Sequence, residues 1–82
     1  MGTFNYVIKD EVGIHARPAG VLAKMVKGLD STVTITKGGK TVDASKLMAV
    51  MSLGAKKGDE VTVASDSEED LAAVKKFFEE NL

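Results

Sequence analysis

Residues 2–28, GTFNYVIKDEVGIHARPAGVLAKMVKG, change from a strand pattern to a helix pattern and set the organisation of the rest of the chain. Alternate positions in the first part are apolar, at Phe4, Tyr6 and Ile8. This period of two predicts a half-buried strand over residues 2–9. Apolar residues then recur at spacings of three and four, at Ala19, Leu22, Val26 and Leu29. The new period predicts a helix that starts near Ala16 and ends at Gly28.

The later segments repeat the same two patterns. They are expected to be a hairpin of strands 32–37 and 40–43, a short helix 46–53, a strand 60–65 and a last helix after the capping sequence Ser65-Asp66-Ser67-Glu68. Gly38-Gly39 permits the positive φ angles of a tight hairpin turn. Ser45 or a neighbouring residue is expected to cap the short helix, and Gly54 to end it in a left-handed conformation.

The predicted order of elements is βαββαβα, which places the chain in the α+β class. We expect a four-stranded, mostly antiparallel sheet with three amphipathic helices packed on one face. The length of 82 residues suits a single domain over residues 1–82, because one hydrophobic core usually takes about 100 to 200 residues. No internal repeat, linker or low-complexity tract interrupts the pattern.

Composition and charge exclude several classes of function. The chain has no cysteine, which removes disulfide and thiolate chemistry and makes a reducing cytoplasm the expected location. No apolar run reaches the roughly 20 residues that span a bilayer, and residues 1–13 lack the pattern of a signal peptide. The net charge of −1 disfavours nucleic acid as a partner, because phosphate neutralisation needs positive charge. One histidine without cysteine offers no transition-metal site, and we expect no cofactor.

The only histidine, arginine and proline of the chain fall within His15-Ala16-Arg17-Pro18. Proline is tolerated in a first helical turn, so His15 is expected at the N-terminal edge of the helix. Free backbone N–H groups and the positive end of the helix dipole favour an anion there, and the Arg17 guanidinium suits a phosphate. A neutral imidazole at such a place can accept a phosphoryl group. The alternative is that His15 is an ordinary helix cap or surface residue.

The short helix carries more apolar residues than it can bury. They are Leu47, Met48, Val50, Met51 and Leu53. One short helix cannot hide them all, so some are expected to face solvent. Flexible methionines on a surface suit a site that meets several protein partners, whereas methionine as a filler of the core is the alternative.

Two motifs together closely resemble the HPr family, the histidine-containing phosphocarriers of the bacterial sugar phosphotransferase system. They are Gly13-Ile14-His15-Ala16-Arg17-Pro18-Ala19 and Lys46-Leu47-Met48-Ala49-Val50-Met51-Ser52-Leu53-Gly54. The resemblance spans essentially the whole chain and implies an HPr-like open-faced β-sandwich. It implies a monomeric carrier that is not a stand-alone enzyme. In such a carrier His15 takes a phosphoryl group on Nδ1 from phosphorylated enzyme I and passes it to the A components of enzyme II sugar permeases.

The same resemblance implies roles for individual residues. His15 matches the phosphorylated histidine, and Arg17 matches the residue that orients its phosphate. The face on which partner proteins dock is matched by Gly20, Lys24, Lys27, Leu47, Met48 and Met51. The chain departs from some members at Lys46, which stands where they carry a regulatory serine, with Ser45 one residue earlier. We therefore expect a kinase specific for that serine to find no hydroxyl at its target position.

Two other functions fit parts of the pattern. A related regulatory protein that acts mainly by binding would share the fold, but loss of the active histidine would mark it, and His15 is present. A small α+β nucleic-acid-binding module is also compatible with the βαββαβ order. The charge balance and the lack of stacking aromatic residues on the strands beyond Phe4 and Tyr6 favour the carrier.

Overall fold

The computed structural model describes residues 2–82 and has seven elements in the predicted order. They are β1 (Gly2–Val7), α1 (Ala16–Lys27), β2 (Val33–Lys37), β3 (Lys40–Asp43), α2 (Leu47–Ser52), β4 (Glu60–Ser65) and α3 (Glu68–Asn81). The order βαββαβα and the α+β class are confirmed.

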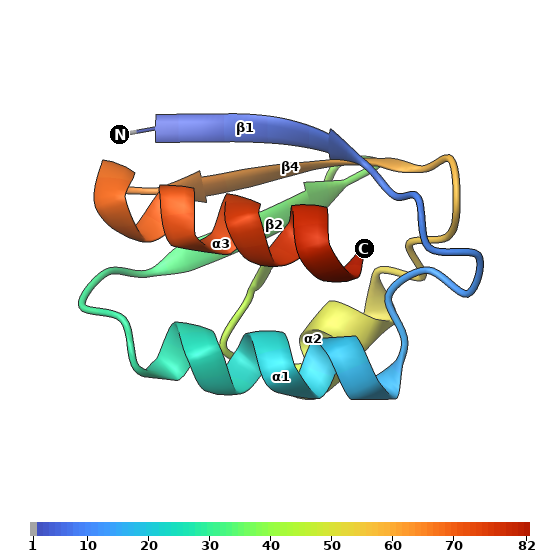
Figure 1. Cartoon of the computed structure of the whole chain (residues 1–82), viewed down its shortest axis with the longest axis horizontal. Coiled ribbons are helices and arrows are strands. Elements are labelled where there is room, and N and C mark those ends of the chain that lie inside the picture. Colours follow the sequence, from blue (N-terminus) through green and yellow to red (C-terminus); the bar gives the residue numbers. More distant parts are fainter. Residues whose placement is uncertain (1) are drawn as a thin grey trace.

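The four strands form one sheet in the order β1-β4-β2-β3, and every neighbouring pair is antiparallel. All three helices lie on one side of this sheet (Figure 1), which leaves its other side uncovered. The prediction of an open-faced β-sandwich is therefore confirmed. The order of the strands could not be read from the sequence, because β1 and β4 pair across most of the length of the chain.

The core lies between the sheet and the helices. Its inward strand residues include Tyr6, Val33, Ile35, Val61 and Val63, which are buried. Phe78 of α3 is fully buried and meets the rings of Phe4, Tyr6 and Phe77 edge to face, with ring centroids 5.9, 5.4 and 6.4 Å away. Full burial of one such side chain stabilises the folded state by about 1.5 to 3 kcal/mol, so these contacts fix α3 against β1.

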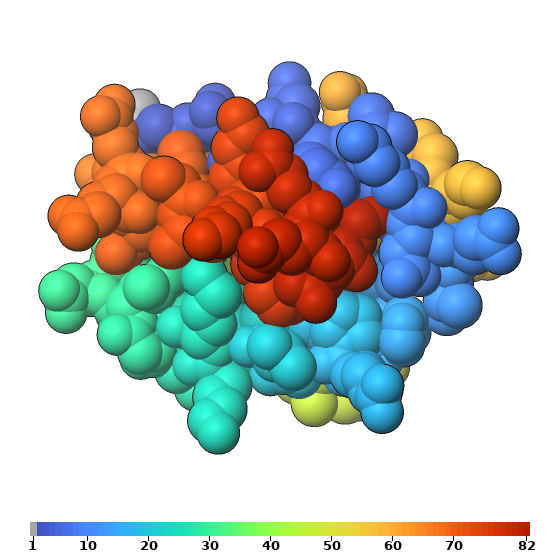
Figure 2. All heavy atoms as spheres, in the orientation of Figure 1, coloured from blue at the N-terminus to red at the C-terminus, as the bar shows by residue number. Residues whose placement is uncertain are grey.

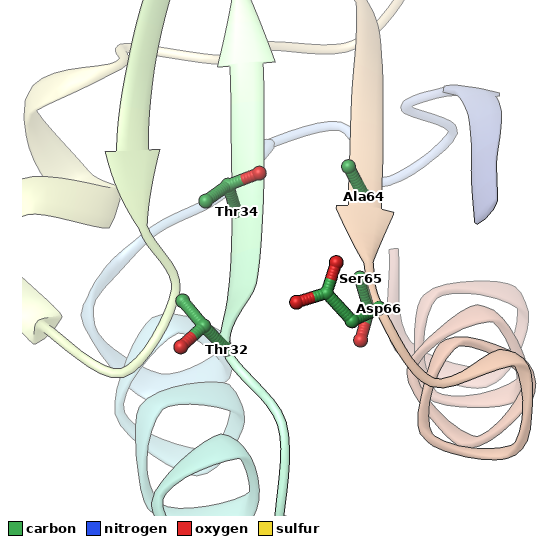
Figure 3. Close-up of a pocket in the computed structure, with 5 residues that line it drawn as sticks. All are labelled: Thr32, Thr34, Ala64, Ser65 and Asp66. Carbon is green, nitrogen blue, oxygen red and sulfur yellow. The ribbon is translucent and has the colours of Figure 1, made fainter. Parts of the chain in front are cut away.

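The uncovered side of the sheet is polar and rich in threonine. Thr36 and Thr41 hydrogen-bond across β2 and β3 at 2.7 Å, and Thr62 donates to Asn5 Oδ1 across β4 and β1 at 2.8 Å. A hollow of about 160 Å³ lies at one end of this side, lined by Thr32, Thr34, Ala64, Ser65 and Asp66 (Figure 3). Thr32 of this hollow follows the C-terminal end of α1 in the chain, whereas His15 precedes the N-terminal end of that helix.

Several boundaries differ from the predicted ones by one or two residues, including the start of β2, which is Val33 and not residue 32. The first strand ends at Val7 and not at residue 9. The N–H of Ile8 still donates to the Asp59 carbonyl beside β4, but those of Lys9 and Asp10 donate to the Leu82 carbonyl instead.

The short helix spans Leu47–Ser52, and of the predicted capping residues, Ser45 or a neighbour, the neighbour Lys46 is the N-cap, without a side-chain bond. It ends at Ser52, one residue before the predicted end, and the predicted left-handed conformation of Gly54 is confirmed by its φ of 62°.

Candidate functional site

A tight loop connects β1 to the first residue of α1. Gly13 in this loop has a φ of 80°, a conformation that favours glycine. A Cβ at this position would lie 2.2 Å from the Ala55 carbonyl oxygen and 2.6 Å from Lys56 Cα. The next residue, Ile14, donates its N–H to the same Ala55 carbonyl at 2.9 Å. The loop can approach residues 55–56 this closely only because residue 13 has no side chain.

His15 is the N-cap residue of α1, as predicted from Pro18. Its backbone is extended, with φ −119° and ψ −175°, and its carbonyl accepts the N–H of Ala19 at 2.9 Å. Its imidazole makes no capping hydrogen bond within residues 2–82 and is half-buried. His15 thus starts the helix through its backbone, which leaves the ring nitrogens available for other contacts.

The first turn of α1 is electropositive. It contains no acidic residue, and Arg17 is exposed beside His15. The first backbone N–H groups of any helix lack intrahelical partners and carry the positive end of its dipole. Neither of the two ion pairs found in residues 2–82 involves Arg17, so its guanidinium can bind an anion near His15.

A cavity of about 300 Å³ joins this turn to the end of α3. It is lined by Asp10, His15, Arg17, Pro18, Val21, Phe77 and Asn81. The space-filling view shows the chain around residues 10–20 against the end of α3 (Figure 2). His15 and Arg17 thus line one cavity, whose size admits a small anion.

Five residues of this cavity were absent from the predicted site residues: Asp10, Pro18, Val21, Phe77 and Asn81. The sequence contains a sign of an exposed position for Val21, because this apolar residue lies off the apolar stripe of the first helix. In the structure it is 53% exposed. Nothing in the sequence marked Asp10 and Asn81 as site residues, since only tertiary packing brings the end of α3 to the loop after β1.

The predicted docking residues lie on α1 and α2, which pack against each other. Lys24 and Lys27 are exposed, and a Cβ at Gly20 would have no heavy atom within 4 Å. Leu47 and Met48 are 39% and 75% exposed, which confirms that the short helix presents apolar side chains to solvent.

Met51 differs from the other docking residues. It is half-buried and packs against the hydrophobic core. Val50 and Leu53 of the same stretch are buried, so Met51 lies at the border between the core and the exposed side of α2. Both interpretations of the methionines therefore hold in part: Met48 is a surface residue, whereas Met51 partly fills the core.

Ser45 and Lys46 occupy different surroundings. Ser45 is half-buried, and its hydroxyl and its backbone N–H both donate to Asp43 Oδ1, at 2.6 and 2.8 Å. These two bonds, the hydroxyl first, hold the pKa of Asp43 below its ordinary value, and nearby Lys46 adds to the effect. The Lys46 side chain is exposed and makes no capping bond in the described chain.

The described residues contain neither a group of metal ligands nor a helix that could span a membrane. No three or more histidine, cysteine, aspartate or glutamate side chains within residues 2–82 are grouped to hold a metal ion. None of the helices in that range is both long enough and apolar enough to cross a membrane.

Comparison with known proteins gives a consistent result. The family model described as the PTS HPr component phosphorylation site matches residues 3–80. The chain is 41% identical over 66 residues to the phosphocarrier protein HPr of Mycoplasma capricolum subsp. capricolum, a stretch that covers 80% of this chain and 74% of that protein.

Solved structures agree with these sequence matches. A histidine-containing phosphocarrier protein from Mycoplasma superposes with a TM-score of 0.88 at 35% identity, covering 93% of this chain and 90% of that one. An HPr dimer from Thermoanaerobacter tengcongensis superposes with a TM-score of 0.63 at 29% identity, covering 88% and 92% of the two chains.

Proposed function

The chain belongs to the HPr family of phosphocarrier proteins, and from this membership we propose that His15 is its phosphoryl acceptor. In this proposal Nδ1 of His15 takes the group from phosphorylated enzyme I and passes it to the A components of enzyme II sugar permeases. The observation that carries the proposal is the imidazole of His15, which makes no capping bond and lines one cavity with Arg17 at the start of α1.

The proposed chemistry needs an unprotonated ring nitrogen and a place for negative charge. The nitrogen attacks phosphorus, an N–P bond forms, and the bond between phosphorus and the donor breaks. Transfer to the next protein reverses these roles, so the carrier returns to its starting state. The Arg17 guanidinium and the first N–H groups of α1 would bind the phosphoryl oxygens and stabilise their charge.

Partner proteins are proposed to dock on the exposed side of α1 and α2. Met48, Leu47 and Val21 provide exposed apolar area, and Lys24 and Lys27 provide positive charge at the end of α1. Apolar contacts of this kind give affinity, whereas charges mainly steer association. In this arrangement Met51 packs α2 against the hydrophobic core. Gly20 has no side chain, so nothing projects from α1 at that position toward a bound partner.

The remaining parts of the proposal concern the state of the carrier. We propose that residues 1–82 act as one HPr domain, as a cytoplasmic monomer without a cofactor, and that the protein relays a phosphoryl group without turning over a substrate of its own. The dimeric relative makes the oligomeric state worth measuring. Sedimentation of the phosphorylated and free protein at working concentrations would show a single monomeric species if this part is correct.

The decisive experiment incubates the protein with phosphoenolpyruvate and enzyme I. We expect one phosphate per chain that is lost in mild acid and kept in base, because a phosphoramidate on histidine has this stability. Mapping should place the phosphate on His15. A phosphate stable in acid, or one placed elsewhere on the chain, would refute the assignment.

Regulation through a serine is proposed to be absent at position 46, where the side chain is an exposed lysine. The nearest hydroxyl, that of Ser45, is engaged with the Asp43 carboxylate, and a phosphate on it would meet that negative charge. Incubation with a kinase specific for the family's regulatory serine and ATP, followed by mass spectrometry, tests this point. Stoichiometric phosphoserine at position 45 would contradict it.

A further inference from the structure

The loop between β1 and α1 is held by one carboxylate that lines the same cavity as His15. Asp10 Oδ1 accepts the N–H of Val12 at 2.9 Å and that of Gly13 at 3.3 Å. The Gly13 N–H also donates to the Asp10 carbonyl at 3.0 Å. We propose that Asp10 is a positioning residue, whose side chain closes this loop and so fixes His15 for phosphoryl transfer. The inference rests on the proposed role of His15.

Little else holds the tip of the loop. The side chain of Glu11 is exposed, and Val12 is 64% exposed, so the hydrophobic core does not order these residues. The ion pair of Glu11 with Lys57, at 3.8 Å, lies on the surface and contributes little. The Asp10 carboxylate is therefore the main local restraint on Val12, and at Gly13 it adds to the backbone bond with the Asp10 carbonyl.

Asp10 also connects this tip to the rest of the fold. Its own N–H donates to the Leu82 carbonyl at 2.8 Å, which ties the start of the loop to the end of α3. At the other side of the tip, Ile14 is bound to the Ala55 carbonyl. Gly13 has the wide conformational freedom of glycine, and between these two anchors the carboxylate acts together with the backbone bond to the Asp10 carbonyl to hold Gly13 in its left-handed conformation.

The position of His15 depends on this geometry because it lies only two residues after Gly13. A small displacement of a reacting group can lower a rate by about a hundredfold. The carboxylate has a second, opposing effect, since its negative charge shares a cavity with the proposed phosphate site. The hydrogen-bonding role and the charge can be separated, because asparagine keeps an oxygen acceptor without the charge, whereas glutamate keeps the charge but moves the acceptor.

The test compares Asp10→Ala, Asp10→Asn and Asp10→Glu with the unsubstituted protein. The matched control is Glu11→Ala, which removes a carboxylate next to Asp10 that makes no bond to the loop backbone. The first measurement is kcat/KM for phosphorylation by enzyme I. We expect Asp10→Ala and Asp10→Glu to lower it about tenfold to a hundredfold. Glu11→Ala should stay within about twofold of the unsubstituted protein. Asp10→Asn should equal or exceed the unsubstituted protein, because it keeps an oxygen acceptor and removes the opposing charge.

The second measurement is amide hydrogen exchange at Val12 and Gly13 in the unphosphorylated proteins, followed by NMR. Protection should fall in Asp10→Ala and Asp10→Glu and be restored in Asp10→Asn, with the exchange of the core strands unchanged. Exchange does not require phosphorylation, so this arm gives its answer even if His15 proves not to be the acceptor. Equal loss in Asp10→Asn and Asp10→Ala, or full activity in Asp10→Ala, would overturn the proposal.

Discussion

The helices α1 and α3 begin in opposite ways. Ser67 caps α3 with its side chain, accepting the N–H of Asp70, and Glu68, Glu69 and Asp70 place negative charge in its first turn. His15 starts α1 without a side-chain cap, and the first turn of α1 has no acidic residue. The side chains of α3 thus balance the positive end of its own dipole. The first turn of α1 has no such side chains, so its N–H groups can bind an anion from outside the protein.

The surroundings of the two helix starts follow the same division. Near α3, the Ser31 hydroxyl donates to Asp70 Oδ2 at 2.8 Å and shares a hydrogen bond with Ser65 at 2.7 Å. Near α1, polar side chains line an open cavity and the bonds that hold the loop run to backbone N–H groups. The polar side chains at the start of α3 bond to one another and stabilise the fold. His15, the proposed phosphoryl acceptor, is held by its backbone, and its imidazole makes no capping bond.

The strongest test of this difference is at His15. His15→Ala should abolish phosphoryl acceptance and change the free energy of unfolding by less than about 0.5 kcal/mol, because the imidazole caps nothing. His15→Ser should be equally inactive but more stable than His15→Ala by about 1 kcal/mol, since serine can cap α1 as Ser67 caps α3. Phosphorylation assays and chemical denaturation measure both effects. A phosphorylated His15→Ala protein would rule out His15 as the acceptor.

Gly13→Ala tests whether the backbone holds the site. The new Cβ would clash with the Ala55 carbonyl at 2.2 Å, so we expect a loss of about 3 kcal/mol in unfolding free energy together with slower phosphorylation. Gly38→Ala is the control, because Gly38 has a φ of 56° but open space around it. It should cost about 1 to 2 kcal/mol for the left-handed conformation alone. Equal losses in denaturation experiments would show that the close approach to Ala55 is unimportant.

Met48→Glu tests whether the exposed apolar residues beside α1 serve partners. We expect binding to enzyme I to weaken about tenfold or more, because a charge replaces an exposed apolar contact. Stability should change by about 0.5 kcal/mol or less. Val7→Glu introduces the same charge at an exposed apolar residue elsewhere, on β1, and should leave binding unchanged. Calorimetric titration of both variants with enzyme I distinguishes a binding surface at Met48 from a general effect of added charge.

Ser67→Ala should affect the other helix start without affecting function. The N–H of Asp70 loses its side-chain acceptor, and removal of such a cap costs about 1 kcal/mol of stability. Phosphorylation by enzyme I should keep its rate at a temperature where the variant remains folded. A decrease in that rate would mean that the two helix starts are coupled through the core, against the division described above.

The smallest effect concerns Asp43 at the same end of the molecule as Ser31. The hydrogen bonds from Ser45 lower the pKa of Asp43 in the folded state, so its ionised form stabilises the fold above the unfolded pKa near 3.9 and loses this contribution as pH falls through the lower folded value. Ser45→Ala should therefore be less stable than the unsubstituted protein at pH 7. Acid titrations of unfolding free energy should show the difference between the two proteins becoming smaller as the pH falls below the unfolded pKa of Asp43. A difference that stays constant throughout the acid titration would contradict this linkage.

Local signals in the sequence determined the identity and order of the elements and the central pair of the candidate site. Alternation marked β1, helical spacing marked α1, and Pro18 placed His15 and Arg17 at the start of that helix. The cap of α3 was foreseen only as a stretch of four residues, of which the structure selects Ser67. Such features depend on neighbours within about one helical turn, which the sequence displays directly.

Tertiary structure decided what surrounds His15. The strand order brings β1 beside β4, and the packing of Phe78 against Phe4 and Tyr6 sets α3 along β1. Only then does the end of α3 reach the loop after β1, where the Leu82 carbonyl binds the N–H of Asp10. Met51 likewise became a core contact through the packing of α2. These contacts join residues far apart in the chain, and burial of apolar surface selects them without any short sequence pattern to mark the partners.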